Sequence, residues 1–254
     1  MSHEPTVRIV PGADTAVLFL HGILGTPKHF RDILPAESLV PSEWSVYNIL
    51  LDGHGKGVED FSRTSMKKWR EQVWKVFSEL SRTHERIILV GHSMGTLFSI
   101  QLAAEHPDKV KQLFLLAVPM RPWMRWFGIV NMLRMPFGLI REDHPVEAAT
   151  KEVCGVGTSW MLWKYLGWIP RFLELFAEIG RTEKKLSDLK VPCVAYQSER
   201  DELVSNLTRG VLERSGKIQI RYLPDSTHFY YAPDDKKRIV NDFKILMEDA
   251  KNHA

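Results

Sequence analysis

Cysteine is scarce in this chain of 254 residues, which contains two, Cys154 and Cys193. Their spacing fits neither a disulfide framework nor a paired zinc motif, so we expect a reducing compartment. The motif H-E-x-x-H is absent and no His/Asp cluster has ligand spacing, so we expect no metal and no cofactor. Long apolar runs are missing as well. The run Leu113 to Met120 is far shorter than the roughly 20 residues of a membrane-spanning helix.

A strong excess of one charge is also missing. Lysine and arginine number 34 and aspartate and glutamate 31, which gives a net charge of +3. No basic stripe accompanies this small charge, so we expect no nucleic-acid partner. The first residues lack a basic segment followed by an apolar one, so we expect no secretory signal and a cytoplasmic protein. The hydrophobic content of 44% is ordinary for a soluble globular chain with a sizeable core.

What the sequence does contain is an alternation of short apolar runs with helical patterns. Most runs lack polar alternation, as expected for parallel strands covered on both faces. Helices are predicted after Ser65, over Thr96 to Glu105, and from Pro233 with Asp234 and Asp235 as a solvated start. The alternation predicts an α/β fold with a mostly parallel central sheet and helices on both faces. The predicted strands are 16–22, 44–50, 86–91, 112–118, 191–197 and 217–223.

One long segment, 119–190, interrupts this alternation. We predict that it is an inserted helical cap, and that 1–118 and 191–254 form the core domain. The segment holds five of the eight tryptophans: Trp123, Trp126, Trp160, Trp163 and Trp168. Most of these aromatics are expected to form a core of the cap's own, and some Trp and Met residues to line a pocket. Contact with a membrane surface is left open but not expected.

The stretch LVGHSMGTL places Ser93 between Gly91 and Gly95. A lone G-x-S-x-G is weak evidence, but this one joins a predicted strand to a predicted helix. Such a sharp turn needs glycines that do not clash, and it presents the serine hydroxyl at the carboxyl edge of the sheet. We therefore predict that Ser93 is a nucleophile.

A serine nucleophile needs a base and a carboxylate that orients the base. His228 follows the last predicted strand by five residues, where such a base is expected. Asp201 follows the preceding strand and is the predicted acid, with Glu199 and Glu202 as alternatives. Asp225 lies three residues before His228 and is interpreted as a turn residue.

The tetrahedral intermediate of acyl transfer needs donors for its oxyanion. The stretch LFLHGILG ends a predicted strand, and in such a loop the backbone N–H of Ile23 points into the site. The backbone N–H of Met94 is its expected partner, and losing one such donor typically costs about 3 kcal/mol of transition-state stabilisation. Three other histidines are interpreted as structural: His21 holds the loop by a hydrogen bond, His54 lies in a Gly-rich loop, and His92 faces away from Ser93.

With FLHGILGT, LDGHGKG, LVGHSMGT, SERDELVS and DSTHFY, the chain resembles the α/β-hydrolase superfamily over nearly its full length. It is most similar to bacterial carboxylesterases and monoacylglycerol-lipase-like enzymes with a small helical cap. The resemblance implies Ser93, Asp201 and His228 as a catalytic triad, with Ile23 and Met94 as backbone donors. Two departures concern the geometry of the site. Thr96 replaces a glycine that is common in relatives, and YQSERD replaces a version that usually contains glycine.

The expected activity is hydrolysis of carboxylic esters with short- to medium-chain acyl groups, monoglycerides among them, through an acyl-enzyme. The expected partner is therefore a small acyl ester. Among enzymes, the alternative activity is that of an acyl-thioesterase, and peptidase or carbon–carbon hydrolase activity is a weaker alternative. A ligand-binding member of the fold without catalysis is an alternative of a different class. Dehalogenase and epoxide hydrolase chemistry is disfavoured because the nucleophile position holds Ser93 and not Asp. The sequence does not set the oligomeric state.

Overall fold

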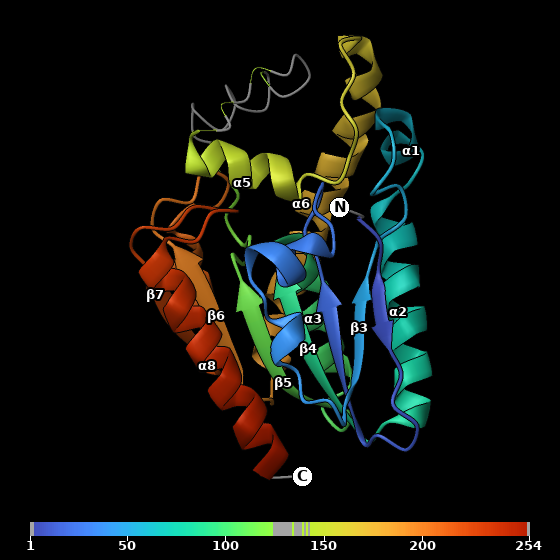
Figure 1. Ribbon diagram of the computed structural model, residues 1–254, viewed down its shortest axis with the longest axis vertical. Helices are drawn as coiled ribbons and strands as arrows, with labels where there is room; N and C mark the ends of the chain where they lie inside the picture. The colour runs from blue at the N-terminus through green and yellow to red at the C-terminus, as the bar shows by residue number, and fades with distance from the viewer. Residues whose placement is uncertain (1–2, 124–133, 135–138, 140, 142, 253–254) are drawn as a thin grey trace.

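A seven-stranded sheet lies at the centre of the molecule (Figure 1). The computed structural model describes residues 3–123, 134, 139, 141 and 143–252. The strand order is β1-β3-β2-β4-β5-β6-β7, with β1 antiparallel to β3 and the other pairs parallel. The strands are β1 (Thr6–Arg8), β2 (Thr15–Leu20), β3 (Ser45–Ile49), β4 (Arg86–His92), β5 (Val110–Leu116), β6 (Cys193–Ser198) and β7 (Ile218–Leu223).

Helices cover both faces of this sheet. Among the described residues, the α-helices are α1 (Val58–Ser62), α2 (Met66–Thr83), α3 (Met94–Glu105), α5 (Pro145–Val153), α6 (Ile169–Lys185), α7 (Thr208–Glu213) and α8 (Pro233–Asn252). Shorter helical segments are η1 (His29–Ile33), η2 (Glu37–Leu39), η4 (Leu162–Trp168) and η5 (Leu186–Asp188). In Figure 1, α8 lies in front of the sheet on its β6 and β7 side, α3 lies behind the central strands, and α2 lies at the opposite edge behind β1.

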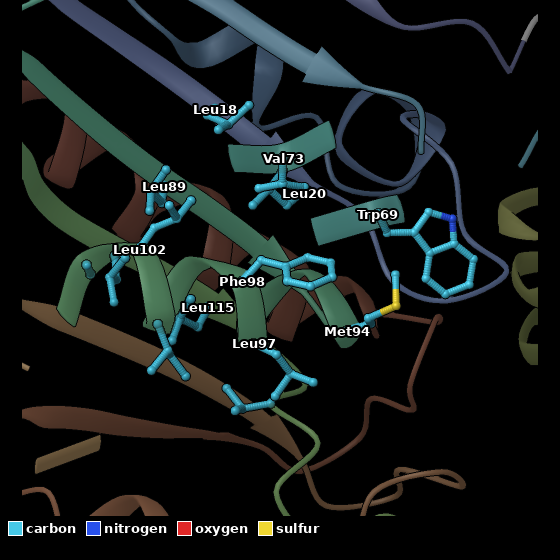
Figure 2. Packing of buried hydrophobic residues seen from close by; sticks show 14 of the residues in the cluster. Leu18, Leu20, Trp69, Val73, Leu89, Met94, Leu97, Phe98, Leu102 and Leu115 are labelled. Carbon is cyan, nitrogen blue, oxygen red and sulfur yellow. The ribbon is translucent and has the colours of Figure 1, made fainter. Parts of the chain in front are cut away.

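Alternate residues of each central strand enter two separate apolar cores. On β2, Leu18 and Leu20 belong to one cluster with residues of α2 and α3, and Figure 2 shows Leu20 beside Val73 of α2. Phe19 of the same strand faces the second core, which contains residues of η1 and α8. Because both faces of the strand are covered, its sequence shows no polar alternation. The predicted α/β architecture is therefore confirmed.

The six predicted strands are present with ends shifted by up to two residues. The sequence pattern does not predict β1, because its three residues are partly exposed and form no apolar run. Helix α3 begins at Met94, two residues before the predicted start, and Ser93 is its N-cap. The last helix begins at Pro233 as expected, but Asp235 is buried and not solvated, because it accepts a hydrogen bond from Ser226 Oγ at 2.7 Å.

The segment 119–190 contains α5, η4, α6 and η5, and we call it the insertion. Figure 1 shows α5 crossing above the carboxyl ends of the strands. The second half of α6 is part of the main core, where Ile179 is 5% exposed. Glu178 fixes this half, since its buried carboxylate accepts hydrogen bonds from Arg70 of α2, Gln101 of α3 and Arg181 of α6. These contacts bind the insertion to two helices of the core.

The tryptophans of the insertion are mostly exposed. Trp123, Trp160 and Trp163 are more than 60% exposed, whereas Trp168 is buried. Trp126 lies outside the described residues. The expectation that most of them form a core of their own is therefore wrong for the four described tryptophans. The physical reason is that α6 packs its buried side on α2 and α3, and no second apolar layer of the described residues covers its other side.

The uncovered side of η4 and α6 is itself apolar. Its residues recur at spacings of three and four, which places them along one side of the helical segments. We call this set the exposed apolar face: Leu162, Leu166, Ile169, Leu173 and Phe176. Within the residues that the structure describes, no helix is both long and apolar enough to pass through a membrane.

Candidate active site

The turn from β4 into α3 holds Ser93 in a conformation that few side-chain-bearing residues adopt. Its φ is 50° and its ψ is −122°, outside the regions that residues with a Cβ normally occupy. The Ser93 N–H donates to the carbonyl of Leu116 on β5 at 2.9 Å, which fixes the turn to the neighbouring strand. The turn is thus a strained strand-to-helix corner of the kind that the sequence predicts.

The two glycines of this corner are required by close packing. A Cβ on Gly95 would lie 1.9 Å from the carbonyl oxygen of Leu20, at the end of β2. A Cβ on Gly91 would lie 2.8 Å from the Cα of Thr96 in the first turn of α3. Both distances are below any that real Cβ atoms adopt, so the corner admits no side chain at either position.

Thr96, the departure from the usual glycine, fits the corner without distortion of the turn. Its hydroxyl donates to the carbonyl of Ser93 at 2.6 Å, and its N–H donates to the same oxygen at 2.9 Å. The residue is fully buried. The threonine therefore closes the turn that carries Ser93, and a glycine is not needed there.

The loop after β2 packs directly against this corner. A Cβ on Gly22 would lie 2.8 Å from the Cβ of Ser93, so the backbone of the loop touches the serine. His21 holds the loop as predicted, because its Nδ1 donates to the carbonyl of Gly22 at 2.9 Å and its Nε2 accepts from Leu51 N–H at 3.0 Å. Next in the loop comes Ile23, which is partly buried.

The two predicted oxyanion donors have unused hydrogens. Met94 is the first residue of α3, and the N–H of a first helical residue has no intrahelical acceptor. Within the described residues, neither the Met94 N–H nor the Ile23 N–H donates to another protein group. Such N–H groups at the start of a helix and in an adjoining loop favour binding of a negative charge.

Asp201 and His228 come together at the carboxyl edge of the sheet. The Nδ1 of His228 lies 2.9 Å from Oδ2 and 3.1 Å from Oδ1 of Asp201. Oδ1 also accepts the N–H groups of Leu203 and Val204, both at 2.8 Å. Because these two N–H groups fix the carboxylate and the carboxylate fixes the ring, the imidazole keeps its Nε2 free for another partner.

The loop of His228 is also bonded to His92, the residue before Ser93. The Nε2 of His92 donates to the carbonyl of His228 at 3.0 Å, and the two rings lie 4.9 Å apart. On its other side, His92 stacks on His29 with ring centroids 3.8 Å apart. In the described structure no hydrogen bond joins Ser93 and His228 directly. Such bonds are often long in free enzymes and shorten when substrate binds.

Glu202, whose place in the sequence also suits the acid, acts on the backbone of His228 and not on its ring. Its Oε2 accepts the N–H of His228 at 3.1 Å, and its side chain is buried. Glu199, the second residue considered for the acid, is exposed. Asp225 accepts a hydrogen bond from the exposed Arg200 at 2.7 Å. The interpretation of Asp225 as a turn residue is consistent with this position.

The loop that carries His228 has a further anchor that the sequence did not indicate. Asp235 of α8 accepts the hydroxyl of Ser226 and, at 3.1 Å, the N–H of Asp225. The same hydroxyl of Ser226 accepts the N–H of Ala232 at 3.1 Å. The loop is therefore closed on the start of α8. The only sign of this anchor in the sequence is the acidic pair Asp234 and Asp235 before a helical pattern. Such a pair also fits an ordinary helix start.

Burial makes the other histidines of the site neutral. It lowers the pKa of His21 to about 4 and that of His29 to about 3, and it lowers those of His54 and His92 well below the ordinary value. Burial also acts to lower the pKa of His228, but the carboxylates of Asp201 and Glu202 together outweigh it, and the net pKa is raised.

The neighbouring carboxyl and thiol groups follow the same physics of burial. The pKa of Glu202 is raised by burial, although the nearby His228 acts to lower it. Cys154 and Cys193 are free thiols, and burial raises the pKa of both. Among the described residues, no group of three or more His, Cys, Asp or Glu side chains could hold a metal ion.

Comparisons with known proteins show what the chain is similar to. Residues 15–135 match the sequence model of the α/β hydrolase fold family. A thermostable monoacylglycerol lipase from Bacillus sp. (strain H-257) is 35% identical over 92 residues. The aligned segment covers 36% of this chain and 36% of that lipase, so it spans only about a third of the relative's length.

Solved structures extend the likeness to almost the whole chain. A metagenome-derived lipolytic enzyme has a TM-score of 0.71 and 18% identity, with 98% of each chain covered. The monoacylglycerol lipase of Paleococcus ferrophilus has a TM-score of 0.66 and 18% identity, with 96% of this chain and 98% of that chain covered. From the fold shared with these structures and the match of residues 15–135 we conclude that the chain has the α/β-hydrolase fold, and part of its sequence is similar to a monoacylglycerol lipase.

Proposed function

We propose that the chain is a serine hydrolase that cleaves carboxylic esters of short- to medium-chain acyl groups by way of an acyl-enzyme. The observation that carries the proposal is the pair formed by Asp201 and His228 at 2.9 Å, on a loop bound to the corner of Ser93. An imidazole held by a carboxylate beside a strained serine is the arrangement that nucleophilic acyl transfer requires.

In the first half of the proposed reaction, Ser93 is acylated. The Nε2 of His228 takes the proton of Ser93 Oγ as that oxygen attacks the ester carbonyl carbon. The carbonyl π electrons move to the carbonyl oxygen, and the N–H groups of Ile23 and Met94 donate to the resulting oxyanion. When the carbon–oxygen bond to the alcohol breaks, the imidazolium gives its proton to the leaving oxygen. Asp201 stabilises the imidazolium throughout without taking its proton.

In the second half, water releases the acid. His228 takes a proton from a water molecule as the water oxygen attacks the acyl carbon. The same two N–H groups bind the second oxyanion, and the bond to Ser93 Oγ breaks as the imidazolium returns its proton to that oxygen. The products are a carboxylic acid, an alcohol and the free enzyme, so no cofactor enters the balance.

The proposed substrate class rests on the insertion, which we propose to be a cap over the site. Its helix α5 crosses the carboxyl edge of the sheet, where Ser93 lies (Figure 1). The exposed apolar face on η4 and α6 and the apolar residues of α6 in the main core support an uncharged acyl chain over a charged one. Monoglycerides fall within this class, in keeping with the lipase that the sequence resembles.

A panel of 4-nitrophenyl esters with acyl chains of two to twelve carbons tests the proposal. We expect turnover with a preference among short and medium chains, and a loss of about 10⁴-fold or more in kcat for Ser93→Ala. Asp201→Asn should lower kcat by roughly 10⁴-fold, because the imidazole loses its orienting carboxylate. Glu199→Gln, an exposed change in the same loop, is the matched control and should leave the rate within about twofold of wild type.

Two results would contradict the proposal. One is turnover that survives Ser93→Ala, and the other is folded protein that hydrolyses no ester of the panel. The panel should include acyl-CoA thioesters beside the matching oxygen esters. A clear preference for the thioester would move the substrate class to thioesters and leave the roles of the triad unchanged.

A further inference from the structure

A short stretch of the insertion is hydrogen-bonded to the loop that carries Ile23. The N–H of Gly155 donates to the carbonyl of Leu24 at 2.8 Å. The carbonyl of Gly155 accepts the N–H of Gly55, and Val156 pairs in parallel with Lys56. Residues 154–157, which we call the clasp, therefore lie between the loop after β2 and the loop after β3.

Leu24 is the residue of the oxyanion loop that most needs such support. Its φ is 60°, in the left-handed region that is unfavourable for a residue with a Cβ. Both of its backbone groups are bound: the N–H donates to Nε2 of His54 at 3.2 Å, and the carbonyl accepts from Gly155. A strained conformation persists where its surroundings hold it. One of the two groups that hold Leu24 belongs to the insertion.

The approach of the clasp is so close that only glycine fits at position 155. A Cβ on Gly155 would lie 1.7 Å from Cγ2 of Thr26 and 3.1 Å from the carbonyl oxygen of Gly25. Thr26 is fully buried, so its methyl group has no free space in which to turn away. A side chain at position 155 would therefore push the clasp and the loop apart, and the bond to Leu24 would be lost.

We propose that Gly155 is a positioning residue for the oxyanion hole, so that the insertion and the Ile23 N–H move as one unit. The inference rests on the proposed function, in which Ile23 is an oxyanion donor. It adds that the position of the Ile23 N–H is fixed by contacts with the insertion as well as by the sheet. A substrate that displaces the clasp would therefore also displace the donor, and one that fits beneath it would keep the donor in place.

The test compares Gly155→Ala with Gly180→Ala, a change in the same insertion where an added Cβ meets nothing within 4 Å. We expect Gly155→Ala to lower kcat by about 10- to 100-fold with KM changed less than about threefold, because the donor acts in the transition state. The midpoint of the pH profile should stay in place, because His228 is not touched. Gly180→Ala should match wild type.

A second change distinguishes positioning from general damage. Thr26→Ser removes the Cγ2 atom that the new Cβ would meet, and it keeps the hydroxyl that lies 3.3 Å from His3 Nδ1. The double variant Gly155→Ala with Thr26→Ser should regain at least about fivefold of the lost kcat, while Thr26→Ser alone stays within about threefold of wild type. If the pair shows no rescue, or Gly155→Ala keeps wild-type kcat, the inference is wrong.

Amide hydrogen exchange gives a measurement that does not depend on turnover. The amides of residues 22–26 should exchange faster in Gly155→Ala than in wild type, and Gly180→Ala should leave their exchange unchanged. If Gly155→Ala does not fold, Val156→Ala takes its place, with the same expected result. Unchanged protection of this loop in a folded clasp variant contradicts the inference whether or not the protein has esterase activity. Inactive wild-type protein with the expected change in exchange would instead contradict the proposed function alone.

Discussion

At the scale of single residues, His228 is held by two carboxylates that act on different atoms. Asp201 binds the ring through Nδ1, and Glu202 binds the backbone N–H. Both charges stabilise the imidazolium, and the pKa of His228 is raised although burial acts to lower it. The neutral His92 and His29 and the hydroxyl of Tyr231 complete the surroundings of this loop.

We predict that Glu202→Gln moves the acid limb of the kcat/KM profile to lower pH. The amide keeps an acceptor for the His228 N–H but removes a negative charge, so the imidazolium is less stable and the pKa of His228 falls. The base is active when neutral, so activity then appears at lower pH. The plateau rate should stay within about threefold. Glu199→Gln is the control, and a limb that moves equally in both variants contradicts the role of Glu202.

The glycine of the corner that meets the end of β2 gives a prediction about stability. Gly95→Ala should lower the free energy of unfolding by about 3 kcal/mol or prevent folding, because the Cβ would lie 1.9 Å from a backbone oxygen that cannot rotate away. Gly210→Ala is the control, since an added Cβ there meets nothing within 4 Å. Urea denaturation measures both. Equal stability of the two variants would contradict this packing.

The places of Ser93, Asp201 and His228 in the fold could be predicted from the sequence, because each follows a strand that ends at the same edge of the sheet. Their catalytic roles stay predictions. The roles of Glu202, Asp235 and Gly155 could not be found this way. Each role depends on a contact between two segments that are distant in the sequence, and local sequence patterns do not predict such contacts. Asp235 in particular has the same sequence context as an ordinary acidic helix start.

At the scale of elements, the parallel strands were predictable and the insertion was only partly so. The central strands β2, β4 and β5 are apolar on both faces over most of their length, and their runs end at turns. Helix α6 is also apolar on two sides, one of which packs on α2 and α3 while the other is exposed. Periodicity finds that such a segment is helical but does not tell which side is buried. For this reason the sequence pattern misplaces the tryptophans of the insertion.

The two sides of α6 should respond differently to truncation. Ile179→Ala should lower the free energy of unfolding by about 2–4 kcal/mol, because Ile179 is 5% exposed and packs in the main core. Leu173→Ala on the exposed apolar face, where the side chain is 63% exposed, should change it by less than about 0.5 kcal/mol. Chemical denaturation distinguishes the two. A large cost at Leu173 would mean that another group covers this side in solution.

At the scale of the whole molecule, the fold keeps four neutral histidines buried near one edge of the sheet. His21, His29, His54 and His92 have lowered pKa values, so the unfolded chain binds protons on them that the folded chain does not. Stability then falls as pH decreases below about 6.5. His228 acts in the opposite sense, because its raised pKa gives stability that is present below about 6.5 and lost as pH rises.

We therefore predict a net loss of stability between pH 7 and pH 5, since the four buried histidines outnumber His228 and Glu202, whose raised pKa values act in the opposite sense. The lowering of the His21 pKa to about 4 corresponds by itself to on the order of 3 kcal/mol at full effect. Urea midpoints across this range measure the slope. His29→Phe removes one of the four histidines and should make the dependence of stability on pH shallower. An unchanged dependence would contradict the claim that His29 is neutral in the folded protein.

The central claim is that Ser93 is activated by His228 and Asp201 in this one molecule, and covalent labelling tests it most directly. The folded protein should react with a fluorophosphonate to give one adduct per chain, which peptide mass mapping places on Ser93. His228→Ala should slow labelling by about 100-fold or more, and Ser93→Ala should abolish it. An adduct on another residue, or labelling at the wild-type rate without His228, would contradict the account.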